Sequence, residues 1–171
     1  WTERVLNKIN QLEAVAKPIR ALDLCAGSGA IGIAVLKNTD HTTVDFVELD
    51  PAHQSTILHN LDQNSVAADR ARVFVGDLFA ALPAPPIPYD FILTNPPYLV
   101  KDSAKVAASV ANFEPELALY AQQAGLAIIE RILATATNHL TPTGELWLEH
   151  DDDQVEALQQ LAETHGLTLE T

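Results

Sequence analysis

The chain has 171 residues, of which 47% are hydrophobic, enough for one well-buried domain over 1–171. Its formal net charge of -13 argues against non-specific binding to nucleic-acid phosphates, which depends on Lys and Arg. The single cysteine excludes an internal disulfide bond, and the six histidines lack the short paired spacing of a zinc site. The histidine spacing leads us to expect no metal site. No apolar run is long enough to cross a membrane, so we also expect no membrane partner.

Strands and helices are predicted to alternate along most of the chain. The spacing of Val5, Ile9, Leu12 and Ala16 predicts a helix that ends at Lys17-Pro18. In chain order there follow a strand over 20–25, a helix over 30–37, a strand over 43–49, a helix from Pro51 with Asp50 as its cap, strands over 72–76 and 89–94, a helix over 125–140, a turn over 141–144, a strand over 145–149, a helix over 152–164 and a strand from Leu167. The proline-rich segment 81–90 is expected to contain little or no helix. This order predicts an α/β fold, with a doubly wound, mostly parallel sheet covered by helices on both faces.

A glycine-rich loop follows the first predicted strand. Gly27, Gly29 and Gly32 fit the pattern G-x-G-x-x-G between a strand and a helix, and the acid Glu48 ends the next strand. This arrangement is typical of sites that hold an adenosine, with the acid on the ribose hydroxyls. It fits a nicotinamide dinucleotide and S-adenosylmethionine alike, and a tight turn without a ligand is the other interpretation.

Two further acids favour S-adenosylmethionine. Asp23 lies inside the first strand, which is unsuitable beside a pyrophosphate but suits the ammonium group of S-adenosylmethionine, directly or through water. Asp77 follows the third strand and could accept from the adenine amino group, while Leu78 packs on the ring. The alternative for Asp77 is a helix cap. We therefore expect S-adenosylmethionine as cofactor and S-adenosylhomocysteine as its product.

The segment Asn95-Pro96-Pro97-Tyr98 follows the fourth strand, at the same carboxyl edge of the predicted sheet as the glycine loop. Its prolines exclude regular helix or strand. The Asn95 side-chain oxygen and the Pro96 carbonyl could accept both hydrogens of a planar nitrogen, and Tyr98 offers a ring for a flat target. The segment therefore predicts methyl transfer to an amide or aromatic amino group, and a proline-rich loop without a ligand is the alternative.

Seven segments, in this order over most of the chain, resemble the HemK/PrmC family of protein-glutamine methyltransferases: DLCAGSGAIGIAV, VELDP, GDLF, ILTNPPYL, NFEPELALYA, GLAIIERIL and GELWLEH. NPPY alone is shared with enzymes that methylate adenine or cytosine amino groups, whereas FEPELAL, over 113–119, resembles the glutamine enzymes. The resemblance implies a Rossmann-like class I methyltransferase domain. It also implies methylation of the glutamine in the GGQ motif of peptide-chain release factors, while a sister branch modifies a large-subunit ribosomal protein.

The resemblance assigns roles to particular positions. It makes Gly27 and Gly29 the cofactor loop, Glu48 the ribose acid, and Asp77 and Leu78 the adenine site. From the sequence patterns and the resemblance together, the residues expected to bind the cofactor are Asp23, Cys25, Ala26, Gly27, Ser28, Gly29, Glu48, Leu49, Asp77, Leu78 and Asn95. The implied catalytic residues are Asn95, Pro96, Pro97 and Tyr98. Cys25 stands where many relatives have the first glycine of the loop, a substitution that a negative φ would accommodate.

The resemblance also indicates what surrounds the domain. The helical N-terminal substrate domain of the family and the last strand of its sheet are expected to be missing from 1–171. We expect a release factor as protein substrate, a monomer, no direct nucleic-acid binding, and a cytoplasmic protein, or one of the mitochondrial matrix if the source is a eukaryote. The open alternatives are a ribosomal-protein substrate, a nucleic-acid amino group, and a non-catalytic module that binds S-adenosylmethionine.

Overall fold

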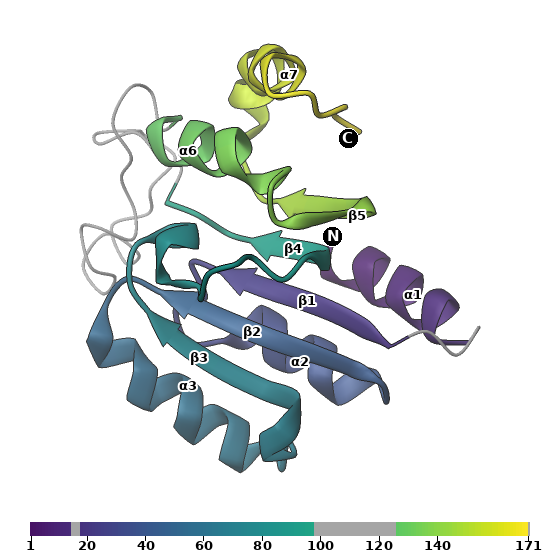
Figure 1. The fold of residues 1–171 in the computed structure, drawn as a ribbon, viewed down its shortest axis with the longest axis vertical. Coiled ribbons are helices and arrows are strands. Elements are labelled where there is room, and N and C mark those ends of the chain that lie inside the picture. The colour runs from purple at the N-terminus through teal and green to yellow at the C-terminus, as the bar shows by residue number, and fades with distance from the viewer. Residues whose placement is uncertain (15–17, 98–125, 171) are drawn as a thin grey trace. The chain divides into compact units, whose positions relative to one another are not determined.

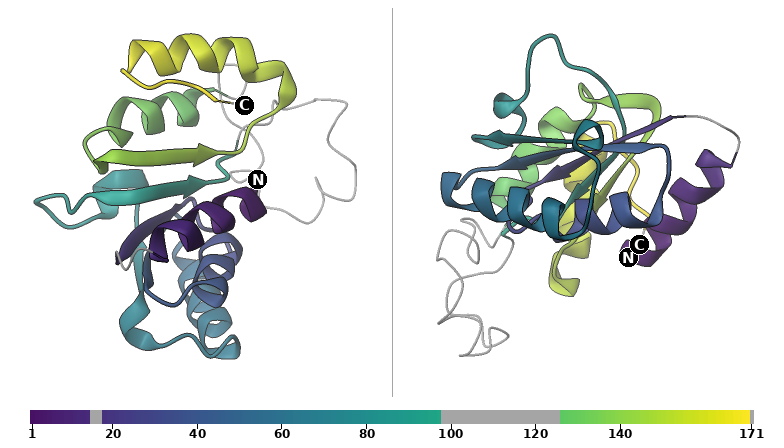
Figure 2. Two further views of the ribbon diagram at one scale, coloured as in Figure 1. Left: turned by 90° about the vertical axis from the view of Figure 1, so that its right-hand side faces the viewer. Right: turned by 90° about the horizontal axis from the view of Figure 1, so that it is seen from below.

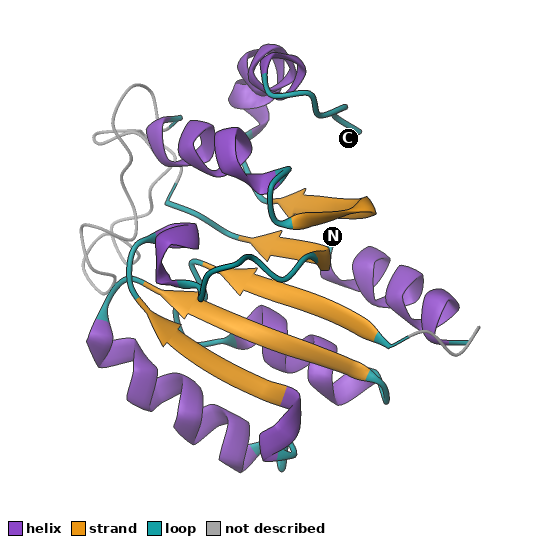
Figure 3. Ribbon diagram, viewed as in Figure 1, coloured by secondary structure: helices purple, strands orange, loops and turns teal. Residues whose placement is uncertain are grey.

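The computed structural model describes residues 1–14, 18–97 and 126–170 (Figure 1). These residues form two compact units. The first unit comprises the described residues within Trp1–Thr94 and Asn138–Trp147, and the second those within Asn95–Thr137 and Leu148–Thr171. Figure 3 shows strands and helices in succession along the chain, so the predicted alternation is confirmed.

Five strands of the described residues form one sheet, in the order β3-β2-β1-β4-β5. Their bounds are β1 Ile19–Leu24, β2 Thr42–Glu48, β3 Ala71–Val75, β4 Tyr89–Thr94 and β5 Leu140–Leu148. The pairs β1–β2, β1–β4 and β2–β3 are parallel, so the carboxyl ends of β1 to β4 share one edge of the sheet. At that edge Leu24 lies opposite both Val47 and Thr94. The predicted α/β fold with a parallel sheet is confirmed.

Helices α1, α2 and α3 lie against one face of the sheet (Figures 1 and 2). The helices of the first unit are α1 Thr2–Glu13, α2 Ala30–Asn38, α3 Pro51–Gln63 and the short 3-10 helices η1 Ala68–Arg70 and η2 Leu78–Ala81. The second unit contains α6 Ala127–Ala136, η3 Asp152–Gln154 and α7 Val155–Thr164, and α6 packs on α7. No helix of the described ranges combines the length and the apolar character needed to cross a bilayer.

The core of the first unit lies between the sheet and α1 to α3. Side chains alternate along each strand, so Ala21, Phe46 and Leu93 face the helices and are buried there. The ring of Phe46 packs directly against Gly32 in α2, where any Cβ would collide with it. The third glycine of the loop pattern therefore lets the helix approach the sheet.

Several local predictions are confirmed. The Asp50 side chain caps α3 by accepting from the Ala52 amide at 2.8 Å, and Pro51 occupies the first turn. Strand β4 has the predicted bounds, and Asn95 to Pro97 form neither helix nor strand. Between η2 and β4 the proline-rich segment contains no helix.

Two local predictions are wrong. The predicted turn over 141–144 lies within β5, because this segment runs beside the start of β4. There the Tyr89 amide donates to the His139 carbonyl at 2.7 Å, and a Cβ on Gly144 would lie 2.8 Å from the main-chain carbonyl oxygen of Tyr89. The predicted strand from Leu167 is absent from the described residues, since the Leu167 amide instead donates to the Ala162 carbonyl and closes the end of α7.

Candidate active site at the carboxyl edge of the sheet

The loop between β1 and α2 reverses the chain within five residues. Cys25, Gly27 and Gly29 all have positive φ, of 60°, 55° and 80°. The negative φ that would accommodate Cys25 is therefore not found, because the chain must turn at once after β1 to begin α2 at Ala30. A non-glycine residue in this region carries a strain of about 1 kcal/mol or more, which the loop's hydrogen bonds must offset.

The acid Glu48 fastens this loop to the end of β2. Its side chain is almost fully buried; Oε2 accepts from the Gly27 amide at 2.8 Å and Oε1 from the Asp50 amide at 2.9 Å. The Nδ1 atom of His53 lies 3.5 Å from the same Oε1. Each carboxylate oxygen has two lone pairs, so Glu48 can hold the loop and still accept from a ligand hydroxyl.

The two glycines of the loop have different surroundings. A Cβ on Gly27 would meet nothing within 4 Å, whereas a Cβ on Gly29 would lie 3.3 Å from both Ile33 and Ile57. Gly29 therefore packs against helices α2 and α3, and Gly27 faces open space. A ligand can approach the backbone at Gly27.

Asp23, one residue before the end of β1, has a buried carboxylate that is only half satisfied. The residue is 1% exposed; Oδ2 accepts from the Gly32 amide at 2.8 Å, and Oδ1 is buried without a hydrogen-bond partner. The pKa of Asp23 is raised to about 7, chiefly by burial and in smaller part by the charge of Glu48, while the Gly32 hydrogen bond lowers it. An unpaired buried carboxylate oxygen is costly, so it marks a place for a donor from outside the chain.

The loop after β3 is also strained. Leu78 has φ 48° in the left-handed region, although it is not a glycine, and the preceding Gly76 has φ 152°. Asp77 occupies the N-cap position of η2, but its side chain makes no cap hydrogen bond. At the end of β2, Leu49 is 55% exposed. Strain of this kind gathers at functional sites, and here it lies on the loops predicted to hold the cofactor.

The structure brings most of the predicted cofactor residues to one edge of the first unit, on the loops after β1, β2 and β3. Asn95, Pro96 and Pro97 follow Thr94 in the chain and belong to the second unit, and Asn95 is exposed. Tyr98 and the segment 113–119 lie outside the described residues.

Two residues of α3 that the sequence did not suggest also hold this edge. Asn60 donates from Nδ2 to the Ser28 carbonyl at 3.0 Å, and His53 lies beside Glu48. They are two helical turns apart and so share a face of α3. The spacing of His53 and Asn60 along the helix that follows the VELDP segment is the sequence signal that could have identified them.

The surroundings of Cys25 disfavour its thiolate, the nucleophilic form of the side chain. Burial raises its pKa to about 12, as do the charges of Glu48, Asp23 and Asp77, although the neighbouring Thr94 hydroxyl has the opposite effect. The described residues also contain no group of three or more His, Cys, Asp or Glu side chains placed to hold a metal ion.

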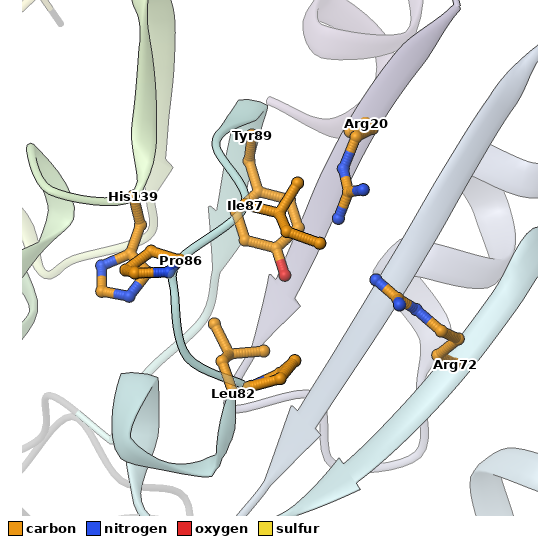
Figure 4. A pocket seen from close by; sticks show the side chains of 8 residues that line it. Arg20, Arg72, Leu82, Pro86, Ile87, Tyr89 and His139 are labelled. Carbon is orange, nitrogen blue, oxygen red and sulfur yellow. The ribbon is translucent and has the colours of Figure 1, made fainter.

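Two hollows of the first unit lie at the other end of the sheet, by the amino ends of the strands, and Figure 4 shows one of them. One, of about 10 Å³, has room for roughly one water molecule. Arg72 holds the Asp45 carboxylate with two 2.7 Å hydrogen bonds, and the Tyr89 hydroxyl donates to it at 2.7 Å. An adjoining hollow of about 240 Å³ shares Arg20, Arg72 and Asp45 with this network and adds Arg70, which donates to main-chain carbonyls. These cations are already bound within the chain, so the network is structural.

The fold is that of known methyltransferases. The crystal structure of a SAM-dependent methyltransferase from Agrobacterium tumefaciens matches with a TM-score of 0.69 at 16% sequence identity, covering 97% of this chain and 49% of that one. At this identity the match shows the fold alone, that of a parallel sheet flanked by helices.

The sequence comparison names the family. The family model described as "Methyltransferase small domain" matches residues 5–114, and the chain belongs to this family. A "Release factor glutamine methyltransferase" of Bordetella pertussis is 36% identical over 159 residues, which are 93% of this chain and 57% of the relative. A "Ribosomal protein uL3 glutamine methyltransferase" of Xanthomonas campestris is 35% identical over 144 residues, 84% of this chain and 46% of the relative.

The chain thus spans about half the length of the curated relatives it matches. These relatives confirm the resemblance to protein-glutamine methyltransferases that the sequence motifs indicated.

Proposed function

We propose that this chain is the catalytic domain of a protein-glutamine N-methyltransferase that uses S-adenosylmethionine and acts on the GGQ glutamine of peptide-chain release factors. The cofactor assignment rests on a buried polar atom without a partner and on open space at the carboxyl edge of the sheet. Asp23 Oδ1 is buried without a partner, and the space beside Gly27 is open. A ligand that brings an ammonium group and ribose hydroxyls supplies what this edge lacks.

The residues of the first unit fit the parts of this cofactor. Glu48 retains acceptor capacity for the ribose hydroxyls while it holds Gly27. Asp23 offers the unpartnered Oδ1 to the ammonium group. Asp77 accepts from the adenine amino group, and the exposed side chain of Leu49 and that of Leu78 pack on the base. The bound cofactor supplies a methyl group already activated on a cationic sulfonium.

The protein must then hold a poor nucleophile. An amide nitrogen reacts slowly because its lone pair is delocalised into the carbonyl. The Asn95 side-chain oxygen and the Pro96 carbonyl accept its two hydrogens, which orients the nitrogen and increases its electron density. Pro96 and Pro97 keep these acceptors rigid, and Tyr98 supports the flat amide. The product loses its extra proton to solvent, so no strong base is needed.

A protein glutamine fits this chain better than a nucleobase. An exposed glutamine flanked by glycines can approach Asn95 without side-chain clashes. A base must leave its stack and bring phosphates toward a chain of net charge -13. The match to uL3 methyltransferases makes a glutamine of that ribosomal protein the second candidate. Either substrate implies a protein that works where ribosomes are, in the cytoplasm or the mitochondrial matrix, and we expect a monomer.

The test uses the full-length protein and methyl-labelled S-adenosylmethionine. A release factor, uL3 and duplex DNA are offered separately, and the methyl group is located by peptide mass spectrometry. We expect label on the GGQ glutamine, and none on a release factor whose GGQ glutamine is replaced. Label on uL3 alone would move the assignment to the second candidate, and label on DNA alone would overturn the protein-substrate proposal.

A further inference from the structure

Asp23 is a buried acid whose carboxylate is only partly hydrogen-bonded. Its two oxygens have one hydrogen bond between them, from the neutral Gly32 amide. Among the residues that the structure describes, no Lys, Arg or His forms an ion pair with Asp23. A charged carboxylate in such a place is unfavourable, because burial penalises the ionised form and no cation of the described residues compensates it.

The groups that face Asp23 do not supply that compensation. On the neighbouring strands Phe46 and Leu93 lie opposite it, and neither carries charge. Helix α2 presents the Gly32 amide in its first turn, and its one basic residue, Lys37, lies in its last turn. The charge of Glu48 acts on Asp23, and it is also negative.

We propose that cofactor binding expels a proton from Asp23. This inference rests on the proposed function, since it concerns the same cofactor, and it adds a pH dependence to that site. In the free protein Asp23 is protonated in a large fraction of molecules near neutral pH. When the ligand ammonium arrives beside Oδ1, the ionised carboxylate becomes the favoured form. The proton passes to solvent, the ammonium keeps its own protons, and a buried ion pair replaces a buried neutral acid.

The direction in which cofactor affinity changes with pH follows from the pKa of Asp23. Burial raises the pKa of Asp23 from 3.8 to about 7 in the free protein. Below pH 7, binding must displace a proton, so affinity falls as the pH falls, by up to about tenfold per pH unit. Above pH 7 Asp23 is already ionised and affinity becomes independent of this group. An aspartate with an ordinary pKa would leave the affinity unchanged from pH 5 upward.

Titration calorimetry measures the proton directly. The full-length protein is titrated with S-adenosylmethionine at pH 7 in two buffers of different ionisation enthalpy, and the difference between the heats gives the protons released. We expect about half a proton per cofactor at pH 7, because the pKa of Asp23 is about 7. The number should rise toward one at pH 6 and fall toward zero at pH 8.

Two further ligands identify the charge responsible. S-adenosylhomocysteine keeps the ammonium but has no sulfonium, so it should release the same fraction of a proton. 5′-Methylthioadenosine keeps adenine and ribose but has no ammonium, so it should bind without proton release. Release with S-adenosylmethionine but not with S-adenosylhomocysteine would assign the effect to the sulfonium and overturn the role of the ammonium.

Variants locate the proton on Asp23. Asp23→Asn retains an oxygen for the Gly32 amide. This variant should bind S-adenosylmethionine more weakly, without proton release and without the pH dependence of affinity. Thermal unfolding confirms that the variant is folded. His53→Gln tests the other titratable side chain beside Glu48, and Asp62→Asn removes an exposed carboxylate from α3. Both should still release the proton.

The outcomes separate this inference from the proposed function. Binding of S-adenosylmethionine without proton release from pH 6 to 8, or loss of the release in His53→Gln, would overturn the inference and leave the cofactor assignment standing. Failure of the wild-type protein to bind S-adenosylmethionine would overturn the proposed function itself.

Discussion

Replacing Glu48 by alanine separates its two roles, in holding the glycine loop and in binding the cofactor. Its carboxylate accepts from the amides of Gly27 at 2.8 Å and Asp50 at 2.9 Å. Hydrogen bonds to a charged group each contribute about 1.5–3 kcal/mol. Water reaches the open side of Gly27 and offsets part of the loss, so Glu48→Ala should lower the free energy of unfolding by about 2 kcal/mol.

The loss of cofactor affinity comes in addition. If Glu48 also accepts from the ribose hydroxyls, the substitution removes a charged acceptor worth about 1–3 kcal/mol, which raises the dissociation constant of S-adenosylmethionine roughly 5- to 150-fold. Calorimetry measures this constant, and thermal unfolding first confirms that the variant is folded at the temperature of the titration.

Glu13 provides the matched control. Its carboxylate also accepts from two amides, those of Asp40 at 3.0 Å and His41 at 2.9 Å, at the other end of β2. Glu13→Ala should therefore lower stability by a similar amount and leave cofactor affinity unchanged. If the two variants reduced affinity equally, or if Glu48→Ala bound normally, Glu48 would not be the ribose acid.

The remaining predictions concern the two loops and the Asn-Pro-Pro-Tyr segment. Gly27→Ala and Gly166→Ala both place a side chain at positive φ in open space, so each should cost about 1 kcal/mol of stability; only Gly27→Ala should weaken cofactor binding in calorimetry, and equal binding would show that no ligand approaches Gly27. Cys25→Gly should raise the free energy of unfolding by about 0.5–1 kcal/mol, because it relieves the strain at φ 60°; a lower denaturation midpoint would contradict this. Asn95→Ala should slow methyl transfer about a hundredfold while the cofactor dissociation constant stays the same; a parallel loss of both would make Asn95 a structural or cofactor residue.

The parts of the fold that follow from local chemistry could be predicted. Pro51 after Asp50 fixes the start of α3 by a cap and a restrained φ, and both depend on neighbouring residues alone. The segment 141–144 could not be predicted in this way. Its threonines, proline and glycine favour a turn, but pairing beside Tyr89 holds it as strand, and that contact joins residues about fifty positions apart.

The candidate site also has features that follow from the order of residues and features that depend on packing. The glycine pattern and Glu48 indicate an adenosine site because their order along the chain reflects the strand–loop–helix unit. The positive φ of Cys25, the unpartnered Oδ1 of Asp23 and the contact of Asn60 with the Ser28 carbonyl depend on how β1, α2 and α3 pack. Sequence patterns do not contain that information.

The central claim is that the carboxyl edge of this sheet holds S-adenosylmethionine and not a dinucleotide. Calorimetric titration of the wild-type protein with S-adenosylmethionine and with NAD, under the same conditions, tests it most directly. We predict saturable binding of S-adenosylmethionine at one site per chain and no binding heat with NAD. Saturable binding of NAD, with none for S-adenosylmethionine, would contradict the assignment of Asp23 and Glu48 and would make the site that of a dehydrogenase.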